Sequence, residues 1–315
     1  MQLQFTKIHG AGNDFIVVND LAQKIELTPK QVARLCDRHF GIGADGVILI
    51  RPSQNSQAAA YMHYINSDGT LAEMCGNGVR CFAKFLVDND LVDSSSGSLI
   101  ADTMAGLKPI NFEVDANGKL TSATVDMGEP AFAPNLIPTN LLETRQINIA
   151  YPGSPTEQLV PAVVQAVARG PQTNLPLSCV NMGNPHAVIF LEYLDDVTAQ
   201  AFVQNPISFD VDSPGRYLES NQSCFPEKTN VEFAAKSGNN KIKMRVYERG
   251  VGETLACGTG ACATAVAAVI LGLVTRTETI EVELLGGTLE INWLPNNHVQ
   301  MRGPAMTIFE GNIDI

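Results

Sequence analysis

The sequence predicts an α/β protein of the α+β type, made of two pseudo-symmetric domains that each wrap β-strands around a central α-helix. Two observations support this fold class. Runs of alternating or β-branched residues surround one apolar helical segment in each half of the chain. Each helical segment begins with a Cys-Gly-x-Gly motif, at residues 75–78 in the first half and 257–260 in the second. The same motif at matching points of two similar halves indicates a duplicated structure.

The first half combines strand patterns with one helix pattern. The helix is expected over residues 78–87, where apolar side chains recur at helical spacing. The pair Asn117-Gly118 is typical of a tight turn between antiparallel strands. The strands of this half are expected at residues 2–8, 14–19, 46–50, 61–65, 98–104 and 110–126.

The second half repeats this pattern after a segment rich in proline. Residues 130–176 hold eight of the 17 prolines and are expected to form loops, with a short helix at about 156–168. The apolar helix of this half is expected over residues 259–273. Its strands are expected at residues 186–191, 229–234, 241–248, 278–284, 288–293, 298–302 and 306–309.

These elements predict an N-terminal domain of residues 1–120 and a C-terminal domain of residues 121–302. The last strand, within residues 303–315, is expected to return to the N-terminal domain. If the halves pack symmetrically, both helix N-termini converge on the cleft between the domains, and each presents one cysteine there. Clefts between domains are common ligand sites, so the active site is expected in this cleft.

Composition and charge exclude several classes of protein. Apolar residues make up 45% and charged residues 17% of the chain, as in a folded globular protein. A formal net charge of -12 and the lack of a basic run argue against nucleic acid or a membrane as a partner. The first residues lack an export signal, and the most apolar stretch, residues 261–274, is too short to span a bilayer. A cytoplasmic protein is expected.

The two Cys-Gly-x-Gly segments carry the strongest functional signal. A cysteine at a helix N-terminus lies near backbone N–H groups and the positive end of the helix dipole, which stabilise a thiolate. Glycines beside it let backbone amides approach a carboxylate. Two such thiols suit a racemase or epimerase, in which one thiolate removes a proton beside a carboxylate and the opposite thiol donates one. No dinucleotide-binding or phosphate-loop motif is present, so no cofactor is expected.

Other interpretations of the seven cysteines remain open. A single Cys-Gly-x-Gly segment is more typical of a small buried residue beside a turn, and two thiols could also form a redox pair. The absence of Cys-x-x-Cys spacing argues against a disulfide scaffold or a metal site. The five cysteines outside the two motifs are expected in the core: Cys36, Cys81, Cys179, Cys224 and Cys262.

Several longer segments match the motifs of one enzyme family. They are HGAGNDF at 9–15, GIGADG at 41–46, NSDG at 66–69, EMCGNGVRC at 73–81, MGNPH at 182–186, TNVEF at 229–233 and YERGVGETLACGTGA at 247–261. On these motifs the sequence resembles the diaminopimelate epimerases, pyridoxal-independent enzymes that convert L,L-diaminopimelate into the meso isomer in lysine biosynthesis. The resemblance implies that Cys75 and Cys257 are the acid/base thiols, that no cofactor is needed, and that the protein is a homodimer.

The resemblance also implies a binding site for an amino-acid substrate. The amides that would hold its reacting carboxylate belong to Gly76, Asn77, Gly258 and Thr259. The residues that would bind its distal end are Asn13, Asn66, Asn184, Asn230, Glu248 and Arg249. Asparagine both donates and accepts hydrogen bonds, and arginine pairs with carboxylates, so this set suits a distal amino-acid group.

Some of these residues have a simpler interpretation. His186 and Glu248 would, by the same resemblance, help to set the protonation states of the thiols, but each could equally be a structural polar residue. Asn13, Asn66 and Asn184 lie within three residues of Gly, Asp or Pro and would, taken alone, be interpreted as turn residues.

The sequence departs from the family pattern in three places. Gly46 stands where some members carry a glutamine in the active site. The segments 130–176 and 212–223 are longer than in compact members of the family, and both are interpreted as surface loops that could touch a dimer interface.

Two rival functions remain at this point. A related two-thiol racemase acting on another amino acid would share the fold, although Asn66, Asn230 and Arg249 favour a substrate with a distal zwitterion. A thiol redox switch in a binding protein is the other rival. It would not need the carboxylate site that the two helix starts provide.

Overall fold

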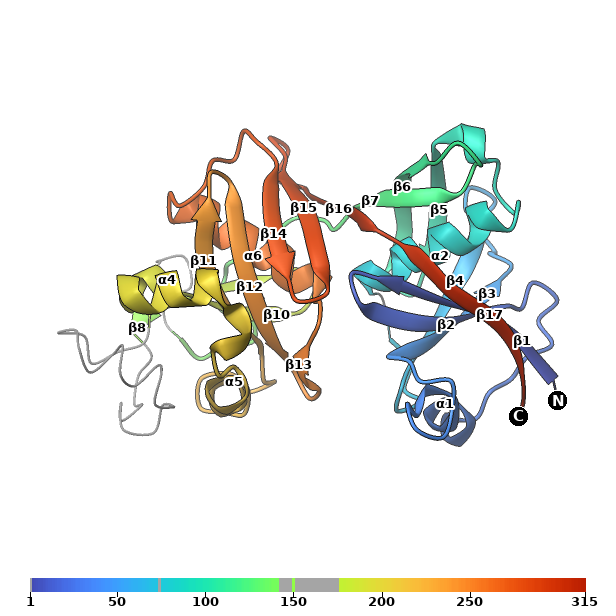
Figure 1. Cartoon of the computed structure of the whole chain (residues 1–315), viewed down its shortest axis with the longest axis horizontal. Coiled ribbons are helices and arrows are strands. Elements are labelled where there is room, and N and C mark those ends of the chain that lie inside the picture. Colours follow the sequence, from blue (N-terminus) through green and yellow to red (C-terminus); the bar gives the residue numbers. More distant parts are fainter. Residues whose placement is uncertain (1, 73–74, 142–148, 151–175) are drawn as a thin grey trace. The chain divides into compact units, whose positions relative to one another are not determined.

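The structure of the chain, a computed structural model, describes residues 2–72, 75–141, 149–150 and 176–315. The α/β class expected from the sequence is confirmed, with many strands and few helices (Figure 1). The chain divides into two compact units. Unit 1 comprises Met1–Asp126 and Arg302–Ile315, and unit 2 comprises Met127–Met301.

Unit 1 contains a mixed sheet in which hydrogen-bonded neighbours follow the order β17-β1-β2-β3-β4-β5-β6-β7. The pairs β2–β3 and β4–β5 are parallel, and the other pairs are antiparallel. Its strands are β1 (Gln2–Gly10), β2 (Asn13–Asn19), β3 (Gly46–Arg51), β4 (Ala60–Asn66), β5 (Ser98–Thr103), β6 (Gly106–Val114), β7 (Leu120–Asp126) and β17 (Met306–Asp314).

Unit 2 repeats this pattern of pairing. Its order is β8-β9-β10-β11-β12-β14-β15, in which β10–β11 and β12–β14 are parallel and the other pairs antiparallel. The short strand β13 pairs with the opposite end of β12. The strands are β8 (Ile149–Ala150), β9 (Pro176–Asn181), β10 (Pro185–Phe190), β11 (Asn230–Gly238), β12 (Lys241–Glu248), β13 (Gly252–Thr254), β14 (Ile280–Leu284) and β15 (Gly287–Trp293). Strand β16 (Val299–Pro304) begins in unit 2 and ends in unit 1.

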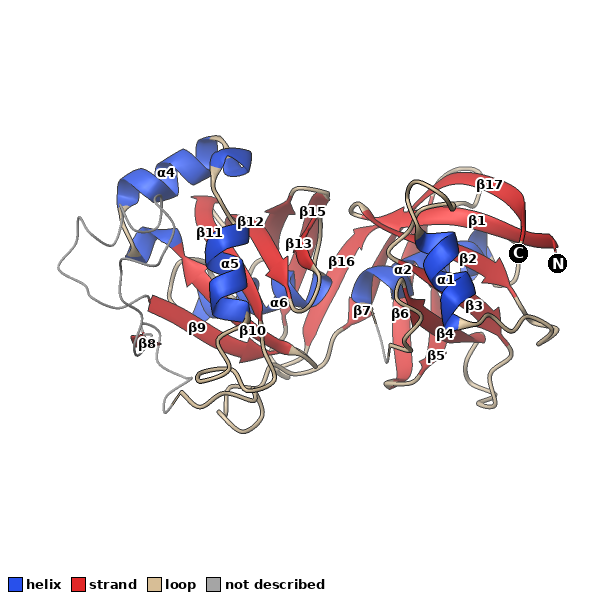
Figure 2. Cartoon of the chain, turned by 90° about the horizontal axis from the view of Figure 1, so that it is seen from below, coloured by secondary structure: helices blue, strands red, loops and turns tan. Residues whose placement is uncertain are grey.

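Each unit holds one helix of 13 residues that begins directly after a cysteine: α2 (Gly76–Asp88) in unit 1 and α6 (Gly258–Ile270) in unit 2. Helix α2 packs against β1, β2 and β7, and α6 packs against β9, β10 and β15. In both units the helix lies among strands (Figure 2). Residues 76–87 of α2 and 260–268 of α6 are buried on every side, as expected for a helix enclosed by a sheet.

The boundary between the units differs from the expected domain boundary at residue 120. Residues 120–126 form β7, which is hydrogen-bonded to β6, so unit 1 extends to Asp126. Strand β17 pairs with β1 in antiparallel fashion over nearly its whole length. Because of this pairing, the last residues of the chain belong to unit 1.

The segment 212–223 is not the surface loop expected from the sequence. Residues Asp212–Glu219 form helix α5, which buries Leu218 in the core of unit 2. Gly215 lies so close to Tyr247 that a Cβ there would be 2.4 Å from the Cβ of Tyr247. An eight-residue helix that contains Pro214 and Gly215 has low intrinsic propensity, so only packing reveals it.

The proline-rich segment is also not entirely a surface loop. Ile137 and Leu141 are buried in the same core cluster as Leu218. The helix expected at 156–168 lies outside the described residues.

Two further helices were not expected. Helix α1 (Pro29–Cys36) begins with a capping box in which Thr28 and Gln31 bond reciprocally, and α4 (Asp196–Gln204) begins at the cap residue Asp195. Each covers strands of its own unit. None of the helices in the described ranges is long and apolar enough to cross a membrane.

Candidate active site

Cys75 is the N-cap residue of α2. Its backbone is extended, with φ -137° and ψ 119°, and its Sγ accepts a hydrogen bond from the N–H of Gly78 at 3.4 Å. The sulfur thus occupies the place that an oxygen of Ser, Thr or Asp usually takes at a helix start. The N–H group and the helix dipole both favour negative charge on the sulfur.

Asn13 lies beside Cys75 and turns its amide oxygen toward the sulfur. The distance from Cys75 Sγ to Asn13 Oδ1 is 3.6 Å, and Asn77 Nδ2 donates to the same oxygen at 3.2 Å. Asn13 Nδ2 donates to Asp45 Oδ2 at 2.6 Å. Because an ionised carboxylate only accepts hydrogen bonds, Asp45 fixes the orientation of the Asn13 amide. The oxygen that faces Cys75 can accept a hydrogen bond from a thiol but has no hydrogen to donate to a thiolate.

Arg80 fixes the second amide of this group. It is completely buried and donates to Asn77 Oδ1 at 2.8 Å and to Gly76 O at 3.4 Å. A guanidinium only donates, so the Asn77 NH₂ group must face Asn13. Arg80 and Asp45 were not predicted as site residues, although both stand within the matched motifs. In these hydrogen bonds both residues act on Cys75 only through an asparagine, and no local sequence pattern marks them as part of a site.

Cys257 caps α6 with nearly the same geometry. Its φ and ψ are -120° and 111°, its Sγ accepts from the N–H of Gly260 at 3.4 Å, and Thr259 Oγ1 is 3.4 Å from the sulfur. Cys257 is buried, and this burial raises the pKa of its thiol well above the usual range. The carboxylates of Glu248 and Glu232 raise this pKa further, whereas the hydrogen bonds from Thr259 and Gly260 lower it.

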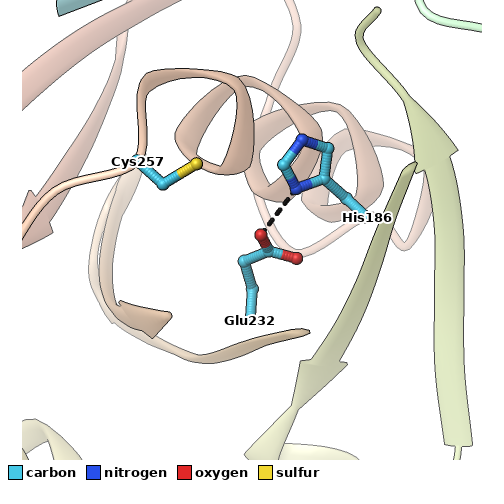
Figure 3. Close-up of side chains that lie close together, drawn as sticks. All are labelled: His186, Glu232 and Cys257. Atoms are coloured by element: carbon cyan, nitrogen blue, oxygen red, sulfur yellow. Dashed lines mark hydrogen bonds and ion pairs between the residues drawn. The ribbon is translucent and has the colours of Figure 1, made fainter. Parts of the chain in front are cut away.

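A buried histidine–carboxylate pair lies next to Cys257 (Figure 3). His186 Nδ1 is 2.6 Å from Glu232 Oε1, and both side chains have 0% exposure. His186 Nε2 is 3.0 Å from Asn184 Oδ1. A ring nitrogen of His186, an oxygen of Glu232 and Cys257 Sγ all lie within 4.8 Å of one another. The structure therefore brings Asn184 and His186 together with Cys257.

The sheet register explains how Glu232 reaches this position. His186 on β10 is opposite Asn230 on the parallel strand β11. Glu232 is two residues further along β11, so its side chain lies on the same face of the sheet. Gly260 provides the space, because a Cβ there would be 2.7 Å from Glu232 Oε1. Glu232 was not predicted as a site residue, although it stands in the matched TNVEF segment. A glutamate in a strand pattern is most often exposed.

His186, Glu232 and Cys257 are the one group among the described residues that could hold a metal ion. A tetrahedral zinc with bonds of about 2.0 to 2.1 Å keeps its ligand atoms more than about 3 Å apart. The 2.6 Å contact between His186 and Glu232 is that of a hydrogen bond. The arrangement therefore fits a proton between these groups better than a metal ion.

Asn230 and Arg249 belong to a second polar group in unit 2. Asn230 Oδ1 accepts from the Arg249 N–H at 2.9 Å, and its Nδ2 donates to Pro185 O at 2.8 Å. Glu219 Oε1 accepts from the N–H of Gly250 at 2.9 Å. Buried Asn230 and Glu219 therefore hold the main chain of the turn at Arg249, whose side chain is exposed.

Two other site residues lie near this turn and at the end of β4. Glu248, the last residue of β12, accepts a hydrogen bond from the Thr254 hydroxyl. Asn66, at the end of β4, donates through Nδ2 to Thr70 Oγ1 at 3.0 Å within its own turn. Both contacts are local.

Gly46 is opposite Asn66 in the β3–β4 pair. A Cβ at residue 46 would lie 2.6 Å from Tyr64 Cε2 and 2.6 Å from Ile65 O. The Tyr64 ring thus occupies the space that the first side-chain atoms of a glutamine at this position would need.

Each unit therefore presents a thiol at a helix start, together with groups that control its proton. Cys75 has an acceptor amide oxygen, and Cys257 has two carboxylates and a histidine nearby. First-turn N–H groups have no acceptor within their own helix, so each helix start can also hold an anion. This combination suits proton exchange beside a carboxylate.

Comparison with solved structures shows the fold. A PhzF-family phenazine biosynthesis protein of Bacillus anthracis matches with a TM-score of 0.67 at 16% identity, covering 100% of both chains. A hydroxyproline epimerase of Agrobacterium vitis matches with a TM-score of 0.66 at 14% identity, covering 99% of this chain and 91% of that chain.

Comparison at the sequence level is much more specific. The chain is 44% identical over 318 residues to a diaminopimelate epimerase of Synechocystis, covering 100% of both proteins. It is 42% identical over 315 residues to that of Methanococcus maripaludis, covering 99% of this chain and 100% of the relative. The family model for diaminopimelate epimerase matches residues 5–133 and 178–308. The chain therefore belongs to the diaminopimelate epimerase family.

Proposed function

We propose that Cys75 and Cys257 are the two acid/base groups with which this isomerase interconverts L,L-diaminopimelate and meso-diaminopimelate in lysine biosynthesis. Membership of the family supplies the reaction and the substrate. The observation that supports these two thiols is their matched position: each caps a central helix and accepts the N–H of the third helical residue at 3.4 Å.

In the proposed reaction the thiolate of one cysteine removes the α-proton from one face of the substrate carbon. The thiol of the other cysteine donates its proton to the opposite face, so the configuration inverts and the two protonation states are exchanged. The carbanion is stabilised through its carboxylate by the N–H groups of Gly76, Asn77 and their counterparts Gly258 and Thr259. The N–H groups of the third helical residues already bond to the sulfurs.

We assign the distal end of the substrate to the side chains named above for that role. Arg249 has an exposed guanidinium that can pair with a carboxylate. Asn230 contributes by holding the Arg249 main chain. Asn13, Asn66, Asn184 and Glu248 offer amide and carboxylate groups for the distal ammonium and carboxylate.

The proposal extends to the state of the protein in the cell. We expect a cytoplasmic homodimer that needs no metal and no pyridoxal phosphate. Sedimentation of the purified protein measures its oligomeric state. Dialysis against a chelator before the assay tests whether a metal ion is needed. Loss of activity that only a metal ion restores would contradict the expectation that none is needed.

The exchange of solvent hydrogen tests the two-base step. Product formed in heavy water should carry deuterium at the inverted centre, because the proton removed remains on the first sulfur. Protium retained at that centre would indicate a single shuttling base. Mass spectrometry of the product distinguishes these outcomes.

Replacement of each thiol tests the assignment to Cys75 and Cys257. Cys75→Ala and Cys257→Ala should each lose inversion by more than the roughly 10²- to 10⁴-fold typical of one acid/base group. Each variant should still exchange the α-proton of one stereoisomer, with opposite preference in the two variants. Near-normal inversion by either variant would remove that cysteine from the mechanism.

The same preparations distinguish the rivals. A racemase for another amino acid would turn over that substrate faster than diaminopimelate. A thiol redox switch would show ligand affinity that depends on oxidation and no turnover.

A further inference from the structure

Glu232 is a completely buried acidic residue that the proposed reaction leaves unused. Its Oε1 is 2.6 Å from His186 Nδ1, and its Oε2 has no hydrogen-bond partner among the described residues. A buried carboxylate that cannot be hydrated is costly unless an opposite charge or a proton compensates it. His186 is the group in contact with it that can supply this compensation.

The contacts of His186 determine how many protons the pair holds. Its Nδ1 faces a carboxylate oxygen and its Nε2 faces the Asn184 amide oxygen at 3.0 Å. Both partner atoms accept hydrogen bonds. With the Asn184 amide oxygen facing Nε2, a ring that donates to both partners carries a proton on each nitrogen, as an imidazolium does. A carboxylate oxygen 2.6 Å from Nδ1 is placed to stabilise that form through a charge-assisted hydrogen bond.

Cys257 needs such a positive charge nearby. The groups around its sulfur are Glu232 from β11, Glu248 from β12, His186 from β10, and Thr259 and Gly260 from its own helix. Burial and the two carboxylates disfavour its thiolate, and the hydrogen bonds from the helix favour it. His186 is the one member of this set that can carry a positive charge.

We propose that Glu232 is a positioning residue that keeps His186 doubly protonated beside Cys257, so that the imidazolium offsets the negative charge that Sγ acquires when Cys257 acts as the base. The proposal rests on the proposed role of Cys257 in the reaction. It does not require a proton to move between His186 and the sulfur.

The proposal can be separated from a direct effect of Glu232, because the two act in opposite directions. As a nearby negative charge, Glu232 makes the Cys257 thiolate harder to form. Through His186, it makes the thiolate easier to form. If the direct effect dominates, Glu232→Gln should raise the thiolate fraction of Cys257. If the effect through His186 dominates, Glu232→Gln should lower it.

The test measures alkylation of Cys257 by iodoacetamide in the full chain carrying Cys75→Ala, at pH 8, with peptide mass spectrometry. Below the ionisation midpoint the rate follows the thiolate fraction. Glu232→Gln should slow alkylation about tenfold, the effect of losing an opposite charge within about 4 to 6 Å. Glu248→Gln is the matched control that removes a carboxylate acting on the same sulfur, and it should speed alkylation.

A second pair of variants isolates the route through His186. In a His186→Phe background, Glu232→Gln should speed alkylation, because only the direct effect remains. Glu232→Asp, which keeps a carboxylate, should restore part of the rate lost in Glu232→Gln. Faster or unchanged alkylation in Glu232→Gln alone would overturn the proposal.

A measurement on the unmodified protein covers the case in which a variant fails to fold. The ¹⁵N chemical shifts of His186 at neutral pH should show two protonated ring nitrogens, with the ring assigned by through-bond correlation to the His186 main chain. A neutral ring would overturn the proposal. None of these measurements depends on turnover of diaminopimelate, so a failed activity assay leaves their outcome unaffected and tests the proposed function separately.

Discussion

Cys75 and Cys257 begin equivalent helices but have different neighbours. Each sulfur accepts a hydrogen bond from the main chain at 3.4 Å. The remaining contact of Cys75 described above is with the neutral amide oxygen of Asn13, whereas Cys257 is surrounded by carboxylates and His186. The two thiols therefore have different surroundings in the structure, and the pKa of the Cys257 thiol is raised by its burial and by the carboxylates beside it.

The raised pKa of Cys257 predicts a pH dependence of stability. A thiol whose pKa is higher in the folded than in the unfolded state stabilises the fold below the unfolded value of about 8.5, and this contribution is lost as the pH rises further. Between pH 7 and 10, the free energy of unfolding of the wild type should fall relative to that of Cys257→Ser. Urea denaturation at each pH measures this difference. A difference that does not vary with pH would contradict the ionisation of Cys257 described here.

Gly46 predicts a second effect at the scale of one residue. Gly46→Gln should destabilise the protein by about 1 to 3 kcal/mol, because its Cβ would overlap the Tyr64 ring and Ile65 O. Gly238→Ala is a suitable control, since its new Cβ would meet only Lys241 at 3.7 Å or more. Thermal unfolding measures both. A Gly46→Gln variant as stable as the wild type would show that Tyr64 yields easily.

At the scale of the element, α5 links the structure of unit 2 to the proposed distal site. Leu218 anchors the helix in the core, and Glu219 beside it accepts the N–H of Gly250 and pairs with Lys228 at 3.0 Å. A helix that was expected to be a surface loop thus helps to fix the turn at Arg249.

Glu219→Ala should therefore weaken substrate binding without removing any group that touches the proposed reacting carbon. We expect kcat/KM for diaminopimelate to fall by the equivalent of about 1 to 3 kcal/mol, mainly through KM, since the main-chain N–H of Gly250 loses a carboxylate acceptor. Asp212→Ala, which breaks only an exposed ion pair with Arg216 on the same helix, should change little. A fall in kcat alone would argue against a positioning role for Glu219.

At the scale of the whole molecule, unit 1 is completed by the last strand of the chain. Strand β17 pairs with β1 from Gln2 to His9, and Phe309 packs edge-on against Phe5. The order of the strands in the sheet thus differs from their order along the chain, and unit 1 contains residues from both ends of the sequence.

Truncation before Met306 should consequently destabilise unit 1 although it removes no proposed site residue. Strand β1 would lose a hydrogen-bonded neighbour and become an exposed edge. We expect a lower midpoint of thermal unfolding and faster proteolysis within residues 2–126, both measurable on the purified truncated chain. An unchanged midpoint would show that β17 contributes little to unit 1.

The sequence by itself determined the features that depend on local pattern. Alternation of apolar residues predicted most strands, and the Cys-Gly-x-Gly motifs predicted where α2 and α6 begin, because an N-cap and its first turn are built from neighbouring residues. The same motifs singled out the two cysteines, and the longer matched segments indicated the family to which the chain belongs.

The tertiary structure decided which residues surround those cysteines. Asp45 reaches Asn13 from 32 residues away, Glu232 reaches His186 from 46, and α5 is stable as a helix through its packing. Such contacts arise from strand register and from the space left by a residue such as Gly260, which no local pattern encodes. From the sequence alone, a glutamate such as Glu232 or an arginine such as Arg80 is expected to be exposed to solvent, and only the tertiary structure shows that both are buried.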